Sequence, residues 1–169
     1  MTALLPTIAL AFFSLTIIWA GIGDIATMRI PNRLILAMLL GFAVLAPLAG
    51  LSPSQAAWGL ASACIVFCLA LGPFALGWMG GGDVKLMAVA ALWLGLPQLP
   101  AFLLWTALSG AFLTLAMIVF RSLPLSGAVA GRAGWVSHLH LDKNRVPYGV
   151  AIASASLIVL SSSPWMALR

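Results

Sequence analysis

Acid–base chemistry in this chain must come from aspartate, because the sequence contains no glutamate. Three aspartates are present, Asp24, Asp83 and Asp142. Asp24 directly follows one long apolar stretch and Asp83 directly precedes another. An ionisable group at the end of a membrane helix is costly to keep there, so it is a candidate functional group. We expect Asp24 and Asp83 to be each other's partner.

A pair of carboxyl groups in a poorly hydrated site has a definite chemistry. Two carboxylates a few ångströms apart cannot both ionise, so one pKa rises and the pair shares a proton. The ionised member can take a proton from water while the protonated member hydrogen-bonds a peptide carbonyl oxygen. This pattern predicts an aspartic peptidase that needs neither a metal ion nor a cofactor.

The neighbours of the two aspartates support this interpretation but also allow structural ones. Asp83 follows a run of three glycines, whose missing side chains can leave room for a peptide backbone; these are Gly80, Gly81 and Gly82. Lys85 and the positive end of a helix would favour the ionised form of Asp83. The alternatives are that Asp83 caps a helix, that Asp24 pairs with Arg29, and that Lys85 extends to the lipid headgroups.

The composition places these residues in a membrane. The chain is 63% hydrophobic and 7% charged over 169 residues, whereas soluble domains carry about 25% charged residues. Stretches close to the length of a membrane-spanning helix cover Leu4–Ile22, Leu34–Leu51, Ala56–Trp78, Val84–Leu96, Ala101–Phe120 and Pro147–Leu160. We therefore expect an all-α polytopic bundle of about six transmembrane helices, forming one domain over residues 1–169. The fourth and sixth spans are short, so protein must enclose them.

The basic residues predict the orientation of this bundle. Lys and Arg accumulate in short cytoplasmic loops, and seven of the eight basic residues here fall on one face, with only Arg169 on the other. Both termini should therefore be non-cytoplasmic and all three aspartates cytoplasmic. The formal charge of +5 thus reports orientation, and we expect no nucleic-acid partner.

Two other groups of residues suggest metal or redox chemistry but do not fit it. Cys64 and Cys68 lie four residues apart within one span, without a CxxC pattern, and are expected to pack inside the bundle. His138, His140 and Asp142 form an HxHxD run, whose alternate residues converge on a metal only in a strand or a special loop. We expect no metal site, and we expect this segment to lie at the lipid interface.

Three motifs occur in order along the chain. Asp24 is followed by the Arg-Ile-Pro-Asn segment 29–32, Gly-Gly-Gly-Asp-Val-Lys occupies Gly80–Lys85, and Arg-Val-Pro-Tyr-Gly occupies 145–149. With these motifs the whole chain resembles the type IV prepilin peptidases, which are membrane aspartyl peptidases of the Gly-x-Gly-Asp type. It is most similar to the short form that serves Flp-type (tight-adherence) pili.

The resemblance implies that Asp24 and Asp83 are the catalytic pair, which removes the short leader of prepilins at the cytoplasmic face of the bacterial inner membrane. It also implies substrate-binding or supporting roles for Gly80, Gly81, Gly82, Lys85, Pro147, Tyr148 and Gly149. Long members of the family carry a cytosolic insertion with paired CxxC motifs between their first two helices. The corresponding loop here is too short for it, so we expect no N-methyltransferase activity, no S-adenosylmethionine and no zinc.

Alternatives remain for the residues and for the whole protein. Pro147 can simply start a helix, and Tyr148 can either donate a hydrogen bond near the pair or anchor the chain at the membrane interface. Paired aspartates in a membrane also serve proton and ion transporters. A non-catalytic subunit of a secretion system is a further alternative.

Overall fold

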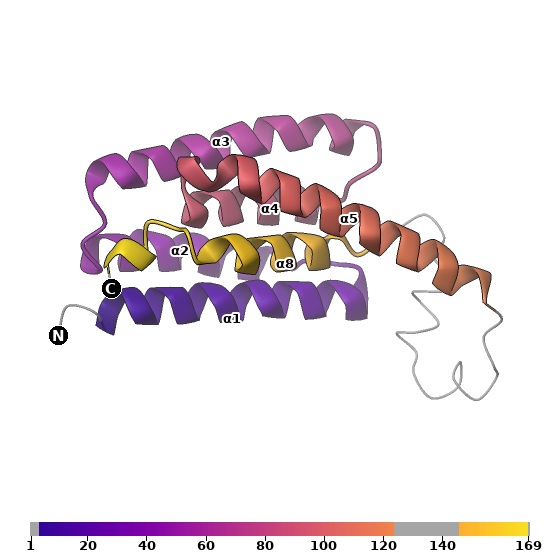
Figure 1. Cartoon of the computed structure of the whole chain (residues 1–169), viewed down its shortest axis with the longest axis horizontal. Coiled ribbons are helices and arrows are strands. Elements are labelled where there is room, and N and C mark those ends of the chain that lie inside the picture. The colour runs from indigo at the N-terminus through magenta and orange to yellow at the C-terminus, as the bar shows by residue number, and fades with distance from the viewer. Residues whose placement is uncertain (1–3, 124–145, 169) are drawn as a thin grey trace.

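The computed structural model describes residues 4–123 and 146–168, and every regular element in these two ranges is a helix. The elements are α1 (Leu4–Thr27), α2 (Asn32–Leu48), α3 (Pro53–Ala75), α4 (Gly81–Leu94), the 3₁₀ helix η1 (Leu96–Gln98), α5 (Leu99–Ser122), α8 (Tyr148–Leu160) and the 3₁₀ helix η2 (Met166–Leu168). Each predicted span overlaps one of these α-helices, with bounds that differ by up to five residues. Consecutive helices run in alternating directions along the long axis of the molecule (Figure 1). The end of α1 and the start of α4 therefore lie at the same end of the bundle.

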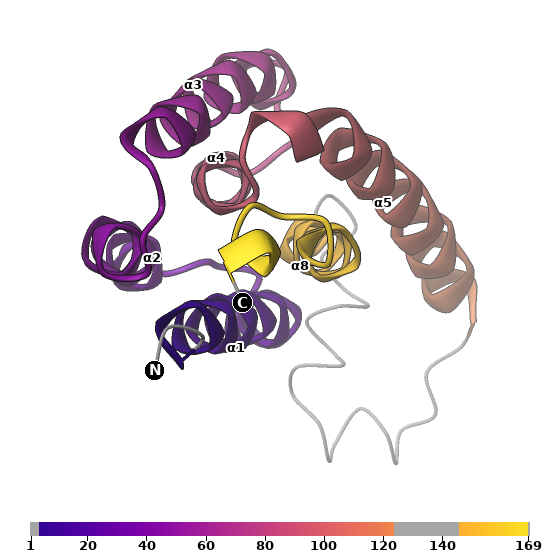
Figure 2. The ribbon, with the colours of Figure 1, turned by 60° about the vertical axis from the view of Figure 1, so that its left-hand side comes forward.

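α4 is the central helix, with α2, α3 and α8 around it (Figure 2). Eleven of its 14 residues are buried, which is the pattern of a helix that is apolar on all sides. A helix of this length extends about 21 Å, less than the hydrocarbon thickness of a bilayer, about 30 Å. The neighbouring helices enclose α4, as is required of an apolar segment too short to cross the bilayer by itself.

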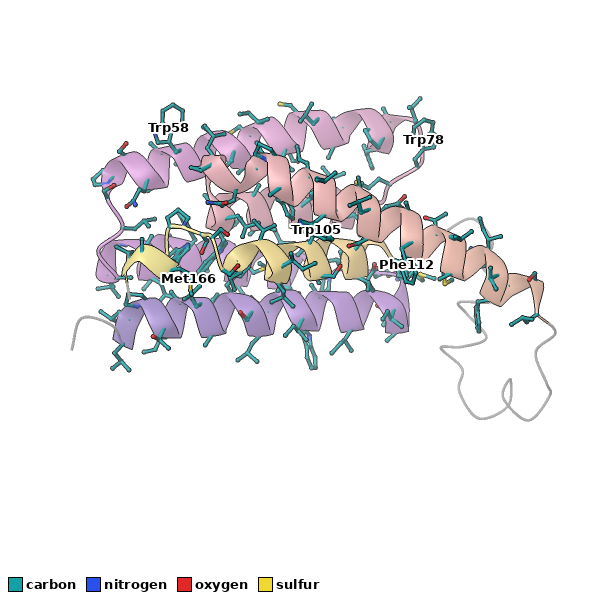
Figure 3. The ribbon with its side chains drawn as sticks, in the orientation of Figure 1. Trp58, Trp78, Trp105, Phe112 and Met166 are labelled. Atoms are coloured by element: carbon teal, nitrogen blue, oxygen red, sulfur yellow. The ribbon has the colours of Figure 1, made fainter. Side chains whose placement is uncertain are left out.

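The outer surface of the bundle is apolar. α1, α3 and the combined segment Leu96–Ser122 are long and apolar enough to cross a membrane. Large side chains such as Trp58, Trp105 and Phe112 project outward from α3 and α5 (Figure 3). These features make the chain a helical membrane protein, as the composition predicts.

A cluster of aromatic side chains fills the bundle far from the start of α4; it consists of Phe12, Phe13, Phe42, Trp93 and Trp165. We call this part of the molecule the aromatic end. The rings of Trp93 and Trp165 are stacked with their centroids 5.0 Å apart. The indole N–H of Trp165 donates to the Trp93 carbonyl at 2.8 Å, and that of Trp93 donates to the Met38 carbonyl at 3.1 Å. The segment after α8 is thereby joined to the central helix.

The expectation that Cys64 and Cys68 pack inside the bundle is wrong, because both are exposed. The buried stripe of α3 contains Ser62, Val66 and Ala70 at helical spacing. These residues set the rotation of α3 about its axis, and Cys64 and Cys68 lie outside the stripe. Apolar composition alone does not reveal which face of a membrane helix meets protein.

Candidate active site

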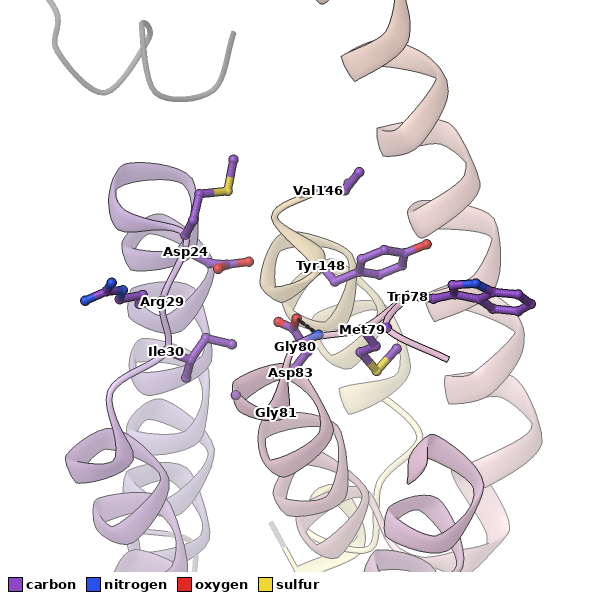
Figure 4. A pocket seen from close by; sticks show the side chains of 13 residues that line it. Asp24, Arg29, Ile30, Trp78, Met79, Gly80, Gly81, Asp83, Val146 and Tyr148 are labelled. Atoms are coloured by element: carbon purple, nitrogen blue, oxygen red, sulfur yellow. Dashed lines mark hydrogen bonds between the residues drawn. The ribbon is translucent and has the colours of Figure 1, made fainter. Parts of the chain in front are cut away.

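A pocket of about 470 Å³ lies at the end of the bundle where α1 finishes and α4 begins, which we call the pocket end. Its lining consists of Asp24, Met28, Arg29, Ile30, Gly77, Trp78, Met79, Gly80, Gly81, Gly82, Asp83, Val146 and Tyr148. Asp24 and Asp83 are 4% and 9% exposed, and their carboxyl groups face the same space between α1 and α4 (Figure 4). The structure thus brings the two predicted aspartates together in one pocket.

Asp24 is held by the start of α8. It lies in the last turns of α1, which continues past the predicted span to Thr27. Its Oδ2 accepts a hydrogen bond from the Gly149 N–H at 2.7 Å. Gly149 is the second residue of α8, and backbone N–H groups in the first turn of a helix have no partner within that helix. A carboxylate is therefore a suitable acceptor there.

Asp83 lies in the first turn of α4 and uses only one of its oxygens. Oδ2 accepts a hydrogen bond from the Gly80 N–H at 3.2 Å, so Asp83 does stabilise the start of its helix, as the structural alternative proposes. Oδ1 is buried without a hydrogen-bond partner in the described part of the chain. A buried, unpaired oxygen is costly, and it leaves this atom free to meet a substrate.

The surroundings of Asp83 favour its neutral form. Burial raises the pKa of the Asp83 carboxyl above its ordinary value, and the nearby charge of Asp24 raises it further, whereas the Gly80 hydrogen bond lowers it. Asp83 lies outside the three helices that are candidate membrane spans. The direction of the shift is the one expected when two carboxyl groups share a proton.

The three glycines before Asp83 leave room for parts of this chain. A Cβ atom on Gly82 would lie 3.2 Å from the Ile30 Cβ, and one on Gly80 would lie 3.0 Å from the Asp83 Oδ2. A Cβ on Gly81 would touch the Phe74 ring at 3.4 Å. The glycines therefore allow the start of α4 to approach its neighbours, in addition to lining the pocket.

Lys85 does not line the pocket. Its Nζ donates to the Asn32 Oδ1 at 3.0 Å in an exposed contact that links the starts of α4 and α2. Arg29 lines the pocket, but its guanidinium points away from Asp24 (Figure 4). The structure thus shows no pairing of Arg29 with Asp24.

The motif at the start of α8 has divided roles. Pro147 is buried and directly precedes the first residue of α8, as a helix-starting proline does. Tyr148 lines the pocket, and its ring fits against Gly110 of α5, where a Cβ atom would lie 2.9 Å from the ring. Gly149 is the residue of this motif that contacts an aspartate.

Several pocket residues were not singled out from the sequence, and two of them are in left-handed turns. Met28 has φ 53° and Gly77 has φ 74°. A left-handed conformation is unfavourable for a residue with a side chain, and such strain tends to cluster at functional sites. The run Gly77–Met79 directly precedes the glycine motif, and this proximity is the feature of the sequence that could have placed it in the pocket. Nothing in the sequence around Met28 indicates its conformation.

The predictions for His138, His140 and Asp142 fall outside the described residues. Within residues 4–123 and 146–168, no group of three or more His, Cys, Asp or Glu side chains could hold a metal ion. The pocket itself contributes two carboxyl groups, those of Asp24 and Asp83.

The fold and the pocket together define a helical membrane protein with a buried pair of carboxyl groups at one end. Residues 10–115 match the model of the type IV leader peptidase family. The chain belongs to this family, which confirms the resemblance seen in the motifs. The special similarity to the short Flp-associated form stays a prediction.

Curated relatives agree with this assignment. The prepilin leader peptidase/N-methyltransferase of Bacillus subtilis (strain 168) is 31% identical over 150 residues, covering 89% of this chain and 53% of the relative. The protein of the same name from Aeromonas hydrophila is 41% identical over 69 residues, covering 38% of this chain and 24% of the relative. The chain thus spans about half the length of the first relative and less of the second. No solved structure matches it significantly.

Proposed function

We propose that this protein is an aspartyl endopeptidase that removes the leader peptide from prepilins, Flp-type prepilins being the expected substrates. The observation that carries the proposal is the convergence of Asp24 and Asp83, from two different helices, on one pocket. Membership of the type IV leader peptidase family and the names of the curated relatives support the same reaction.

The pair supports a metal-free hydrolysis in which all protons are accounted for. The ionised carboxylate takes a proton from water as the water oxygen bonds to the scissile carbonyl carbon, and the protonated carboxyl gives its proton to the carbonyl oxygen. When the resulting diol collapses, the first carboxyl protonates the leaving nitrogen as the C–N bond breaks. The second carboxyl recovers a proton from the diol. The pair returns to its starting state with one proton.

We propose that the pocket end faces the cytoplasm from the bacterial inner membrane and that both termini face the opposite side. Four basic residues lie at this end of the bundle, in agreement with the positive-inside tendency: Arg29 between α1 and α2, and Arg33, Lys85 and Arg121 in the terminal turns of α2, α4 and α5. Since the leader of a prepilin is itself typically basic, recognition would rest on packing of its apolar helix against the exposed apolar helices of the bundle. A prepilin with a polar substitution in that helix should be cleaved poorly.

We propose peptidase activity without N-methyltransferase activity, although the names of both relatives include it. The segment between α1 and α2 consists of residues 28–31. It directly joins the two helices between which long family members carry their cytosolic insertion. Incubation with prepilin and S-adenosylmethionine should yield a cleaved and unmethylated N-terminus by mass spectrometry.

Replacement of each aspartate by asparagine tests the proposal. In proteoliposomes containing an Flp-type prepilin, Asp24→Asn and Asp83→Asn should each lower the cleavage rate by about 10²–10⁴-fold, the range typical of lost acid–base catalysis. Asp142→Asn is the matched control and should cleave normally. Wild-type cleavage rates in either pocket variant would overturn the proposal. Loss of proton flux without any prepilin cleavage would favour the transporter alternative.

A further inference from the structure

The two carboxyl groups of the pocket are held unequally. Asp24 Oδ2 accepts its backbone hydrogen bond at 2.7 Å, and Asp83 Oδ2 accepts its own at 3.2 Å. Short bonds of this kind are typical of charge-assisted hydrogen bonds, which are stronger than neutral ones. The second oxygen of Asp83 is buried without a partner. Burying an ionised oxygen without a partner costs much more free energy than burying a neutral hydroxyl group, which can later donate to a substrate.

The contact between Asp24 and Gly149 requires glycine. A Cβ atom on Gly149 would lie 2.9 Å from both the Cβ and the Oδ2 of Asp24, and 3.1 Å from its Cγ. All three distances are too short for an undisturbed packing. Any side chain at this position must therefore move Asp24 and α8 apart and lengthen the hydrogen bond.

Helix ends act on both aspartates. Asp24 lies at the carbonyl end of α1, which disfavours a negative charge, and the start of α8 with its free N–H groups offsets this effect. Asp83 lies at the favourable end of its own helix. Helix dipoles alone thus do not decide which of the two carboxyl groups is ionised. The shorter hydrogen bond to Asp24 and the unpaired oxygen of Asp83 distinguish them.

Among the residues that the structure describes, few other charged or titratable groups are near the pair. From the segment after α1, Arg29 lines the pocket with its guanidinium turned away, and from α8, Tyr148 lines it with its hydroxyl directed toward α5 (Figure 4). On α4, Lys85 is engaged with Asn32. In the described residues, backbone amides rather than side-chain charges therefore distinguish the two carboxyl groups.

We propose that Gly149 is a positioning residue whose N–H holds Asp24 as the ionised carboxylate, so that Asp83 carries the shared proton on its unpaired oxygen. In the reaction above, Asp24 is then the group that takes the proton from water, and Asp83 is the group that protonates the scissile carbonyl. This assignment rests on the proposed peptidase function. To that function it adds which aspartate acts as the base and which as the acid.

The pH dependence of prepilin cleavage tests the role of Gly149. Gly149→Ala should lower kcat by roughly 10²-fold, since small displacements of a catalytic group have effects of this size. Loss of a hydrogen bond to the carboxylate makes ionisation harder, so activity should also disappear at a pH about one unit higher on the acid side. KM should change little, because Gly149 does not line the pocket.

Two glycines of α1 supply matched controls. Gly21→Ala places a Cβ atom 3.2 Å from the Ala153 Cβ and 3.6 Å from the Gly149 carbonyl oxygen in the same α1–α8 contact, with no Asp24 atom among its three nearest neighbours, and Gly23→Ala meets nothing within 4 Å. The first should lower stability without moving the acid limb, and the second should change neither. An equal shift in Gly21→Ala, or no shift in Gly149→Ala, would overturn the proposal.

A titration without substrate keeps this inference separate from the peptidase proposal. Infrared spectroscopy follows the C=O stretch of protonated aspartate, and the chain has only three aspartates and no glutamate. In Asp83→Asn, the remaining Asp24 should ionise at a lower pH than Asp83 does in Asp24→Asn, while Asp142 contributes equally to both. Adding Gly149→Ala should raise the midpoint in the first variant by about one unit and leave the second unchanged. The reverse order of midpoints, or no effect of Gly149→Ala, would contradict the assignment.

Discussion

The pocket end and the aromatic end of the bundle differ in how their large buried side chains are hydrogen-bonded. At the aromatic end, the indole N–H groups of Trp93 and Trp165 each donate to a backbone carbonyl among stacked rings. At the pocket end, Asp83 keeps a buried oxygen without a partner and Met28 has a left-handed backbone. Within the described residues, the buried indole groups of the aromatic end are thus paired, although the hydroxyl of Ser163, two residues before Trp165, is not, whereas the pocket end leaves a carboxyl oxygen unpaired.

This difference indicates a division between stability and chemistry along the bundle. Unfavourable local features persist only where the surrounding structure is stable enough to impose them. The stacked aromatic cluster and the buried α4 provide such a structure, and they fix the position of Asp83 at the start of α4. We therefore expect substitutions at the aromatic end to change stability and substitutions at the pocket end to change cleavage.

Trp93→Ala is the strongest test of this division outside the pocket. Removal of this fully buried ring should lower the free energy of unfolding by about 3 kcal/mol or more, because it leaves a cavity and removes the stacking partners. The value of kcat per folded molecule should stay unchanged. Thermal unfolding in detergent, combined with a cleavage assay, measures both. Trp105→Ala, at a 41% exposed position on α5, is the control and should unfold close to the wild-type temperature.

Gly59→Ala should have an intermediate effect on stability. A Cβ atom there would lie 2.7 Å from the Leu92 carbonyl oxygen, so α3 and α4 must separate at a cost of about 1–3 kcal/mol. Gly72→Ala on the same helix meets nothing within 4 Å. It should stabilise the helix by up to about 1 kcal/mol. Equal melting temperatures for the two variants would show that the close contact of α3 with α4 is not needed.

Lys85→Met should have the smallest effect. It removes an exposed hydrogen bond to Asn32, which contributes about 1 kcal/mol or less. Since Lys85 does not line the pocket, kcat should fall by less than about tenfold and the pH profile should keep its shape. Asn32→Ala removes the acceptor of the same hydrogen bond and should have the same small effect on kcat and on the pH profile. A shifted pH profile in Lys85→Met alone would restore the interpretation that Lys85 tunes Asp83.

Much of the fold could be predicted because its signals are local. Apolar stretches long enough to span a bilayer and a strong asymmetry of Lys and Arg are visible in the sequence. The two helices between α1 and α4 cross the bundle once in each direction, which puts Asp24 and Asp83 at the same end. The orientation of each helix about its own axis was less accessible. The exposure of Cys64 and Cys68 on α3 shows this limit, since an apolar helix can meet either lipid or protein.

By itself, the sequence determined the class of protein, its helices, its family motifs and the two aspartates as the candidates for chemistry, because these depend on composition and on neighbours along the chain. The tertiary structure decided what holds each carboxyl group. The contact of Gly149 with Asp24, the partner of Lys85 and the packing of Gly82 against Ile30 all join segments that are distant in sequence. Such contacts follow from how whole helices pack against one another, and no local pattern specifies them.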